Sequence, residues 1–348
     1  MIANMSGSAL TAARGTLLSI ALRLLSFLLS QLTVRFVSAA TLGKASVPLE
    51  LLLSTALFVG REGFRLALTK EIGGDGDDAR DGDVDRRDVD DARGEETDSN
   101  KWKDQQIANV SWLSVPVGAV LSLLALSMHL RGCGKDDVDS DQEPYYSLWD
   151  YKLAGILYCL ASFVESLSEP LVIRCLQQMD VATKAKAEGV ALVAKSLSCF
   201  GCLYFSSCGW YVRIVILMMG DGSSGTRGGS STGNFAVTAF GISQLVYASV
   251  FTSIMYRKAR SSKGGIRWPK NIKASKSNPY REKDGRHPSQ YPTRHQNFHW
   301  HTLHLVLIFT LQGLFKHALT EADKFVLSGS AGSYDQGVYA LAASYGGK

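Results

Sequence analysis

Two groups of charged residues stand inside stretches of the sequence that are otherwise apolar. Arg61 and Arg65 are spaced to share one helix face, as are Glu165 and Glu169, which come directly before Pro170, a residue that predicts a kink. A guanidinium group binds phosphate oxygens through two parallel hydrogen bonds, and a carboxylate accepts hydrogen bonds from sugar hydroxyls. Ionisable residues are costly in an apolar span, so these four predict a polar interior or wet cavity suited to an anionic, hydroxyl-rich ligand.

Further charges extend this set into other apolar stretches. Arg14 and Arg23 lie on roughly one side of the first such stretch, and Glu62 is spaced to pair with Arg65. Four more charges follow the last long apolar stretch: Lys316, Glu321, Asp323 and Lys324. Ligand binding is predicted for Arg23, Arg61, Arg65, Glu165 and Glu169. Gating or ion pairing is predicted for Glu62, Lys316, Glu321, Asp323 and Lys324.

Each group also has a purely structural interpretation, which the sequence leaves open. The arginines of the second apolar stretch are able to cap its helix at the cytosolic interface. Glu165 and Glu169 are able to serve as structural partners of Arg14 and Arg23. The charged stretch 316–324 is able to lie along the membrane surface instead of in a cavity.

Long apolar helices are needed to position these charges. The chain has 348 residues, of which 46% are hydrophobic, and a mean hydropathy of +0.02, averages that a soluble protein would also show. Apolar and charged residues are, however, separated along the chain. A membrane-spanning helix needs about 20 mainly apolar residues, and seven segments meet or approach this length: 15–34, 44–60, 107–129, 149–173, 188–210, 235–256 and 299–318. An eighth begins near Tyr334, so we predict an all-α, polytopic transmembrane helical bundle.

The hydrophilic connections predict an orientation. Residues 71–104 are acidic and lack a periodic apolar pattern, which predicts a disordered loop. Residues 257–298 form a basic connection that contains several prolines. Lys and Arg concentrate in the connections that face the cytosol when the N-terminus is cytosolic, and the positive-inside rule therefore favours that orientation.

Other classes of function find little support. The net charge of +5 combines local clusters of opposite sign, so nucleic-acid binding is not expected. The six cysteines and the histidines within 295–304 lack the further ligands of a metal site, and the chain has no phosphate-binding loop and no nucleophile elbow. We therefore expect no metal, no cofactor and no enzymatic activity. The basic stretch 257–294 is most simply a topology determinant, with contact to anionic membrane lipids as its functional alternative.

Several blocks of the sequence resemble one known family. The most specific block runs from Ser54 to Arg65 (STALFVGREGFR), and SEPL at 168–171 and TEADKFVL at 320–327 support it. Together with RLLSFLL at 23–29, these blocks resemble the eukaryotic oligosaccharide translocation protein family, which acts in the dolichol pathway of N-glycosylation.

The resemblance implies a fold like that of the multidrug/oligosaccharidyl-lipid/polysaccharide exporters, with two six-helix lobes around a central cavity. The chain would supply a first transmembrane lobe (1–256), a basic cytosolic loop between lobes (257–298) and the truncated start of the second lobe (299–348). The implied function is translocation of dolichyl-diphosphate-linked oligosaccharide across the endoplasmic reticulum membrane. The alternative is a non-transporting accessory or scaffold protein that contacts other membrane proteins of the same pathway.

Overall fold

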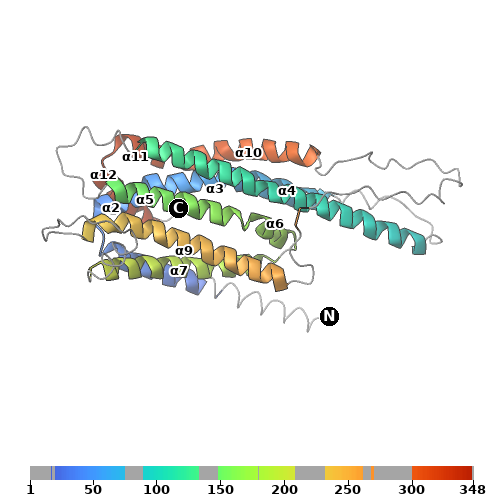
Figure 1. Ribbon diagram of the computed structural model, residues 1–348, viewed down its shortest axis with the longest axis horizontal. Helices are drawn as coiled ribbons and strands as arrows, with labels where there is room; N and C mark the ends of the chain where they lie inside the picture. The colour runs from blue at the N-terminus through green and yellow to red at the C-terminus, as the bar shows by residue number, and fades with distance from the viewer. Residues whose placement is uncertain are drawn as a thin grey trace, which may run out of the picture.

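The computed structural model describes residues 17, 20–74, 89–132, 148–178, 180–207, 232–261, 268–269 and 300–346, and within these residues it contains helices and no strand (Figure 1). An apolar helix, Ile20–Val34, comes first. The elements that follow are α2 (Ala39–Lys44), the π-helix η1 (Ala45–Leu49), α3 (Glu50–Gly74), α4 (Val89–Gly132), α5 (Leu148–Ser166), α6 (Glu169–Gln177), α7 (Val181–Ser207), α9 (Thr232–Ser261), α10 (Trp300–Thr320), α11 (Ala322–Ser330) and α12 (Ser333–Gly346).

Most of these helices are long and apolar enough to cross a membrane. Five qualify singly among the described residues: Ala39–Lys70, Gln105–Gly132, Val181–Phe205, Phe235–Ser261 and Thr302–Thr320. The bent pair of α5 and α6 qualifies as a sixth span, and Ile20–Val34 is a shorter apolar helix within the first predicted segment. The prediction of an all-α, polytopic membrane protein is thus confirmed. The predicted eighth segment corresponds to α12.

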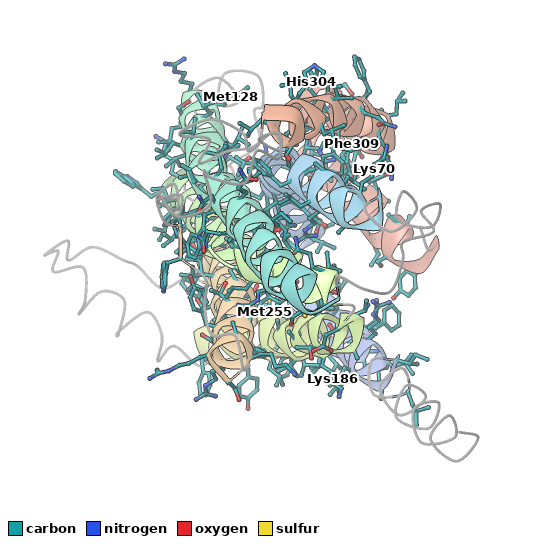
Figure 2. The ribbon with its side chains drawn as sticks, turned by 90° about the vertical axis from the view of Figure 1, so that its right-hand side faces the viewer. Lys70, Met128, Lys186, Met255, His304 and Phe309 are labelled. Carbon is teal, nitrogen blue, oxygen red and sulfur yellow. The ribbon has the colours of Figure 1, made fainter. Side chains whose placement is uncertain are left out.

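Helix α3 carries Arg61 and Arg65 and packs against α4 and α10. α4 runs antiparallel to α3, since Gly60 approaches Gly118 while Phe64 packs with Val110. α10 covers another side of α3, where the Nζ atom of Lys70 lies 5.6 Å from the ring centre of Phe309 (Figure 2). α3 is therefore held between neighbours along most of its length.

α5 and α9 form the adjoining layer of the bundle. They run in the same direction, because the hydroxyl of Thr238 donates to the carbonyl of Asp150 at one end and that of Thr252 donates to Val164 at the other, over 3.3 Å and 3.0 Å. α7 packs antiparallel to α9 (Figure 1). Apolar residues of η1, α3, α5 and α9 share a buried core: Leu49, Leu53, Leu57, Tyr151, Ala154, Tyr158 and Val237.

The fourth predicted apolar segment is broken between α5 and α6. The two helices are bent by 40° at this point, and Pro170 lies in the first turn of α6, where no intrahelical N–H is required. The hydroxyl of Ser168 donates to the carbonyl of Glu165 over 2.7 Å and so satisfies an acceptor at the end of α5. The kink predicted from Pro170 is confirmed, and it sets the directions of the glutamates on either side of it.

The acidic stretch 71–104, for which disorder is predicted, is helical in part. α4 begins at Val89 and so extends into this stretch. Such an extension is possible because adding residues to an existing helix needs no new nucleus. Arg14, residues 75–88 and most of the basic connection 257–298 lie outside the described residues.

Gly63 of α3 sits against the backbone of α10. A Cβ atom at Gly63 would lie 2.8 Å from the carbonyl oxygen of Val306 and would also collide with Thr310. Gly63→Ala is therefore expected to destabilise the protein by about 1–3 kcal/mol through overpacking, measured as a lower unfolding temperature in detergent. The matched control is Gly201→Ala on α7, where a Cβ would meet nothing within 4 Å. This control should be neutral or slightly stabilising, and an equal loss in both variants would contradict the packing explanation.

Candidate functional site

Two arginines of α3 meet two glutamates at the bend between α5 and α6. The Nη1 atom of Arg61 lies 2.6 Å from Oε1 of Glu165 and 3.3 Å from Oε1 of Glu169. Arg65 donates two hydrogen bonds to Glu169, from Nε to Oε2 over 2.9 Å and from Nη2 to Oε1 over 2.8 Å. Glu169 thus bridges both arginines, and we refer to these four residues as the Arg–Glu cluster.

The cluster is buried on its acidic side and partly accessible on its basic side. The side chain of Glu169 has no exposed surface and that of Glu165 is 6% exposed, whereas Arg61 and Arg65 keep 21% and 19%. Two positive and two negative formal charges cancel. Because an unpaired buried charge is strongly unfavourable, each member depends on its partners. The cluster is consequently a structural element of the bundle, whatever else it binds.

Both arginines have hydrogen-bonding groups to spare. A guanidinium group carries five N–H donors. Within the described residues, Arg61 donates to protein groups only through Nη1, and Arg65 only through Nε and Nη2. The Oε2 atom of Glu165 is buried there without a hydrogen-bond partner. The cluster therefore offers free donors at partly exposed arginines and a free acceptor at Glu165, the groups that an anionic, hydroxyl-bearing ligand requires.

Sequence reasoning missed one neighbour of the cluster. Tyr247 of α9 is half-buried and lies within electrostatic range of both Arg61 and Glu165. A phenol is both a donor and an acceptor, so Tyr247 adds a hydroxyl to the polar surroundings of the cluster. No spacing along the chain links position 247 to the cluster, because their proximity arises from the packing of α9 beside α5.

Two candidates, on the helix Ile20–Val34 and on α3, lie apart from the cluster. Arg23 is exposed on the helix Ile20–Val34, which packs against α7 where the hydroxyls of Ser26 and Ser196 are 2.9 Å apart. Glu62 lies on the side of α3 that faces α10, with its Cγ atom 3.7 Å from the position of a Cβ at Gly313. Arg65 takes Glu169 as its partner and not Glu62.

Three of the candidates after the last long span form a separate polar group at the start of α11. Lys324 pairs with Glu321 over 2.8 Å, and the hydroxyl of Tyr339 donates to the carboxylate of Asp323. Lys316 is exposed on α10. The structure therefore brings together four of the ten predicted site residues and leaves this second group at a different place.

The α3–α10 contact contains a buried histidine that sequence reasoning also missed. The Nε2 atom of His317 lies 3.1 Å from the hydroxyl oxygen of Thr55, and its ring stacks on Phe58 with centroids 4.7 Å apart. His317 lies one residue after the predicted candidate Lys316 and faces the opposite way, into the bundle. It ties the helix after the basic connection to the helix that carries the two arginines.

Asp180 caps the N-terminus of α7 just outside the spans. Its carboxylate accepts the hydroxyl and the backbone N–H of Thr183, over 2.7 Å and 3.2 Å, and pairs with Lys258 over 3.4 Å. The hydrogen bond from the Thr183 hydroxyl, followed by the other contacts, lowers the pKa of Asp180 below its usual value. The ionised cap therefore contributes stability above the unfolded-state pKa of about 3.9, and this contribution is lost as the pH falls through the lowered folded-state value.

Asp180→Ala is expected to destabilise the protein by about 1 kcal/mol at neutral pH through loss of the cap. Thermal unfolding at neutral pH and at a pH below about 3 measures the difference, which should shrink on the acidic side. Asp180→Asn is the control, since asparagine caps helices almost equally well. A loss of the same size for Asn and Ala would show that capping is not the cause.

Comparison with known proteins matches most of the chain to one family. The family model described as "Rft-1: Rft protein" matches residues 8–347. The chain is 26% identical to the Man(5)GlcNAc(2)-PP-dolichol translocation protein RFT1 of Yarrowia lipolytica over 97% of its own length and 45% of the relative's. It is 26% identical to the protein of that name from Schizosaccharomyces pombe, over 93% of this chain and 49% of the relative. The protein of that name from Mus musculus is 30% identical over 53% of this chain and 28% of its own length.

The chain spans about half the length of the curated relatives that it matches over most of its own length. No solved structure matches the chain.

Proposed function

Because the chain belongs to the Rft protein family, we propose that it supplies part of a translocator that moves dolichyl-diphosphate-linked oligosaccharide across the endoplasmic reticulum membrane. In this proposal the N-terminus is cytosolic, and the protein moves the lipid without changing it covalently. The proposal joins the relatives' names, which specify a diphosphate-linked dolichol oligosaccharide, to the chemistry of the Arg–Glu cluster.

The spare hydrogen-bonding capacity of the cluster is the observation that carries the proposal. Arg61 and Arg65 keep free N–H donors on partly exposed guanidinium groups, which suit diphosphate oxygens. Glu165 keeps a free acceptor, which suits a sugar hydroxyl. A diphosphate entering the cluster competes with Glu165 for Arg61, so binding and release exchange one anionic partner for another.

The other predicted site residues have secondary places in the proposal. Arg23 contributes a further positive charge from the first helix. Glu321 and Asp323 contact sugars or, with Lys324, gate the passage through ion pairs at α11. These roles require the polar group at α11 and the Arg–Glu cluster to face a common passage in the longer protein.

One observation favours a second candidate, a membrane scaffold or accessory factor of the glycosylation pathway. The charges of the Arg–Glu cluster already cancel, which is what a purely structural lock between α3 and the bent span requires. Such a protein would support glycosylation through contacts with other pathway proteins and would not itself move lipid.

Vesicle reconstitution separates the two candidates. Purified protein is inserted into lipid vesicles with labelled dolichyl-diphosphate oligosaccharide, and the pool reached by an added lectin is followed with time. A translocator makes the inner-leaflet pool accessible faster than vesicles carrying heat-denatured protein do. Restored glycosylation in depleted cells together with no movement in vesicles would replace the translocator with the accessory factor.

A further inference from the structure

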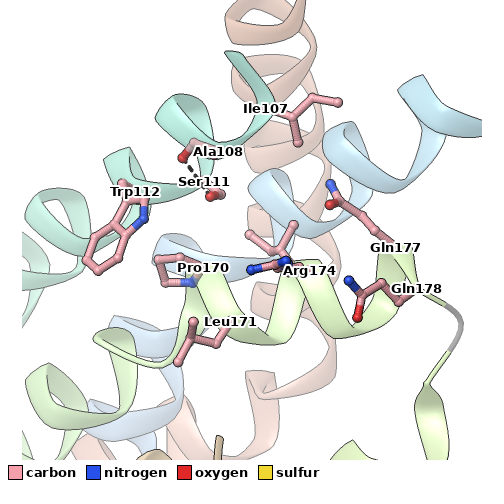
Figure 3. Close-up of a pocket in the computed structure, with 10 residues that line it drawn as sticks. Ile107, Ala108, Ser111, Trp112, Pro170, Leu171, Arg174, Gln177 and Gln178 are labelled. Atoms are coloured by element: carbon pink, nitrogen blue, oxygen red, sulfur yellow. Dashed lines mark hydrogen bonds between the residues drawn. The ribbon is translucent and has the colours of Figure 1, made fainter. Parts of the chain in front are cut away.

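A groove lies between α4 and α6, next to the Arg–Glu cluster along the chain. Its volume is about 280 Å³. Figure 3 shows Ser111 and Trp112 on the α4 side and Leu171, Arg174 and Gln177 along α6. Ser111 and Trp112 belong to the first turns of the apolar part of α4, and Gln177 ends α6. The groove is therefore near one end of two spans, at the depth where a lipid headgroup meets its acyl chains.

The polar lining of the groove includes two side chains with strong hydrogen-bond donors. Arg174 presents a guanidinium group, and the side-chain nitrogen of Gln177 is buried without a hydrogen-bond partner among the described residues. A buried amide nitrogen without an acceptor is unfavourable, so this position favours a ligand that brings an oxygen. A smaller depression next to the groove shares Arg174 and Leu171 and adds Lys258, whose Nζ lies 3.4 Å from the carboxylate of Asp180.

The apolar lining indicates that the oxygen-bearing group belongs to a lipid. Leu171 and Pro170 line one wall of the groove, and Trp112 lies at the other, where its ring stacks on Trp268 with centroids 4.8 Å apart. Tryptophan is enriched at the interface between headgroups and acyl chains. Basic pockets between membrane helices bind acidic lipid headgroups. Because pockets that enclose drug-sized ligands measure about 300–1,000 Å³, the groove is too small to enclose an oligosaccharide.

We propose that the groove between α4 and α6 binds the phosphate group of an acidic membrane phospholipid, with Arg174 and Gln177 as donors. Glu169 and Pro170 are adjacent on α6, so one turn of this short helix joins the groove to the Arg–Glu cluster. A phospholipid bound there steadies α6 in the bent position that presents Glu169 to Arg61 and Arg65. The site is distinct from the diphosphate site and does not depend on translocation.

Native mass spectrometry of the detergent-purified chain tests the proposal with phosphatidic acid as the probe and phosphatidylcholine as the neutral comparison. Wild-type protein should retain one phosphatidic acid with about tenfold preference, as expected for charge-assisted hydrogen bonds, and Arg174→Gln should lose most of that preference. The matched control is Lys186→Gln, which removes an exposed positive charge on α7 outside the groove and should leave binding unchanged.

A second variant keeps the proposal testable if Arg174→Gln does not fold. Gln177→Leu removes the buried, unpartnered nitrogen without leaving a cavity, so it should fold as well as wild type and bind phosphatidic acid several-fold more weakly. Unchanged binding in folded Arg174→Gln or Gln177→Leu protein would overturn the proposal, as would an equal loss in Lys186→Gln. Displacement of phosphatidic acid by equimolar inorganic phosphate, or by polyprenyl diphosphate, would overturn the assignment to a phospholipid.

Discussion

Replacing Glu169 with alanine is expected to destabilise the protein by about 3–5 kcal/mol, the usual cost of removing one partner of a buried ion pair. Glu169 has no exposed side-chain surface and accepts hydrogen bonds from both Arg61 and Arg65. Its loss leaves two partly buried guanidinium groups to share the carboxylate of Glu165. Thermal unfolding of wild type and variant in one detergent measures the difference.

Two further variants give this prediction its controls. Glu188→Ala removes a partly exposed partner of Lys184 at 3.5 Å, and this change should cost less than about 1 kcal/mol. The double variant Arg65→Met with Glu169→Met replaces both partners with apolar side chains and should recover much of the lost stability. If Glu169→Ala costs no more than Glu188→Ala, the cluster does not hold α3 to the bent span.

Arg65→Lys is expected to slow movement of dolichyl-diphosphate oligosaccharide by about tenfold or more. Lysine keeps the positive charge opposite Glu169 but lacks the planar fork that binds a phosphate through two bonds. The loss of one charge-assisted hydrogen bond accounts for a factor of this size. The vesicle assay measures the rate, and unfolding in detergent verifies that the variant is folded.

The matched control for Arg65→Lys is Arg257→Lys, since Arg257 is exposed at the end of α9. This variant should move lipid at the wild-type rate. Equal rates for wild type and folded Arg65→Lys protein would remove Arg65 from the binding site. Equal slowing in both variants would show that the planar guanidinium group of Arg65 has no specific role in lipid movement.

The four members of the Arg–Glu cluster can be found from the sequence, but their pairing cannot. Charges in apolar segments single out Arg61, Arg65, Glu165 and Glu169, and Pro170 predicts the bend at which the glutamates lie. Spacing alone leaves open whether the glutamates pair with the first helix or the second. That choice depends on which helix packs against α5, a tertiary contact that local patterns do not specify.

Other features of the site leave no readable pattern along the chain. Tyr247 lies near the cluster and His317 bonds to Thr55, each from a helix distant in the sequence. The tight packing at Gly63 is not evident from the sequence, because it depends on the position of α10. The groove beside α6 combines residues from two spans. Such contacts require the packed bundle, whereas long spans and costly charges are already evident in composition and spacing.

The most direct test of diphosphate binding at the Arg–Glu cluster is the affinity of a short-chain polyprenyl diphosphate for two variants that should change it in opposite directions. Glu165 and the ligand compete for Arg61, so Glu165→Gln should bind the diphosphate several-fold more tightly than wild type, while Arg61→Gln should bind it about tenfold more weakly. Isothermal titration of detergent-purified, folded proteins measures both. Weaker binding in both variants, or wild-type affinity in both, would contradict a role for the cluster in holding the diphosphate.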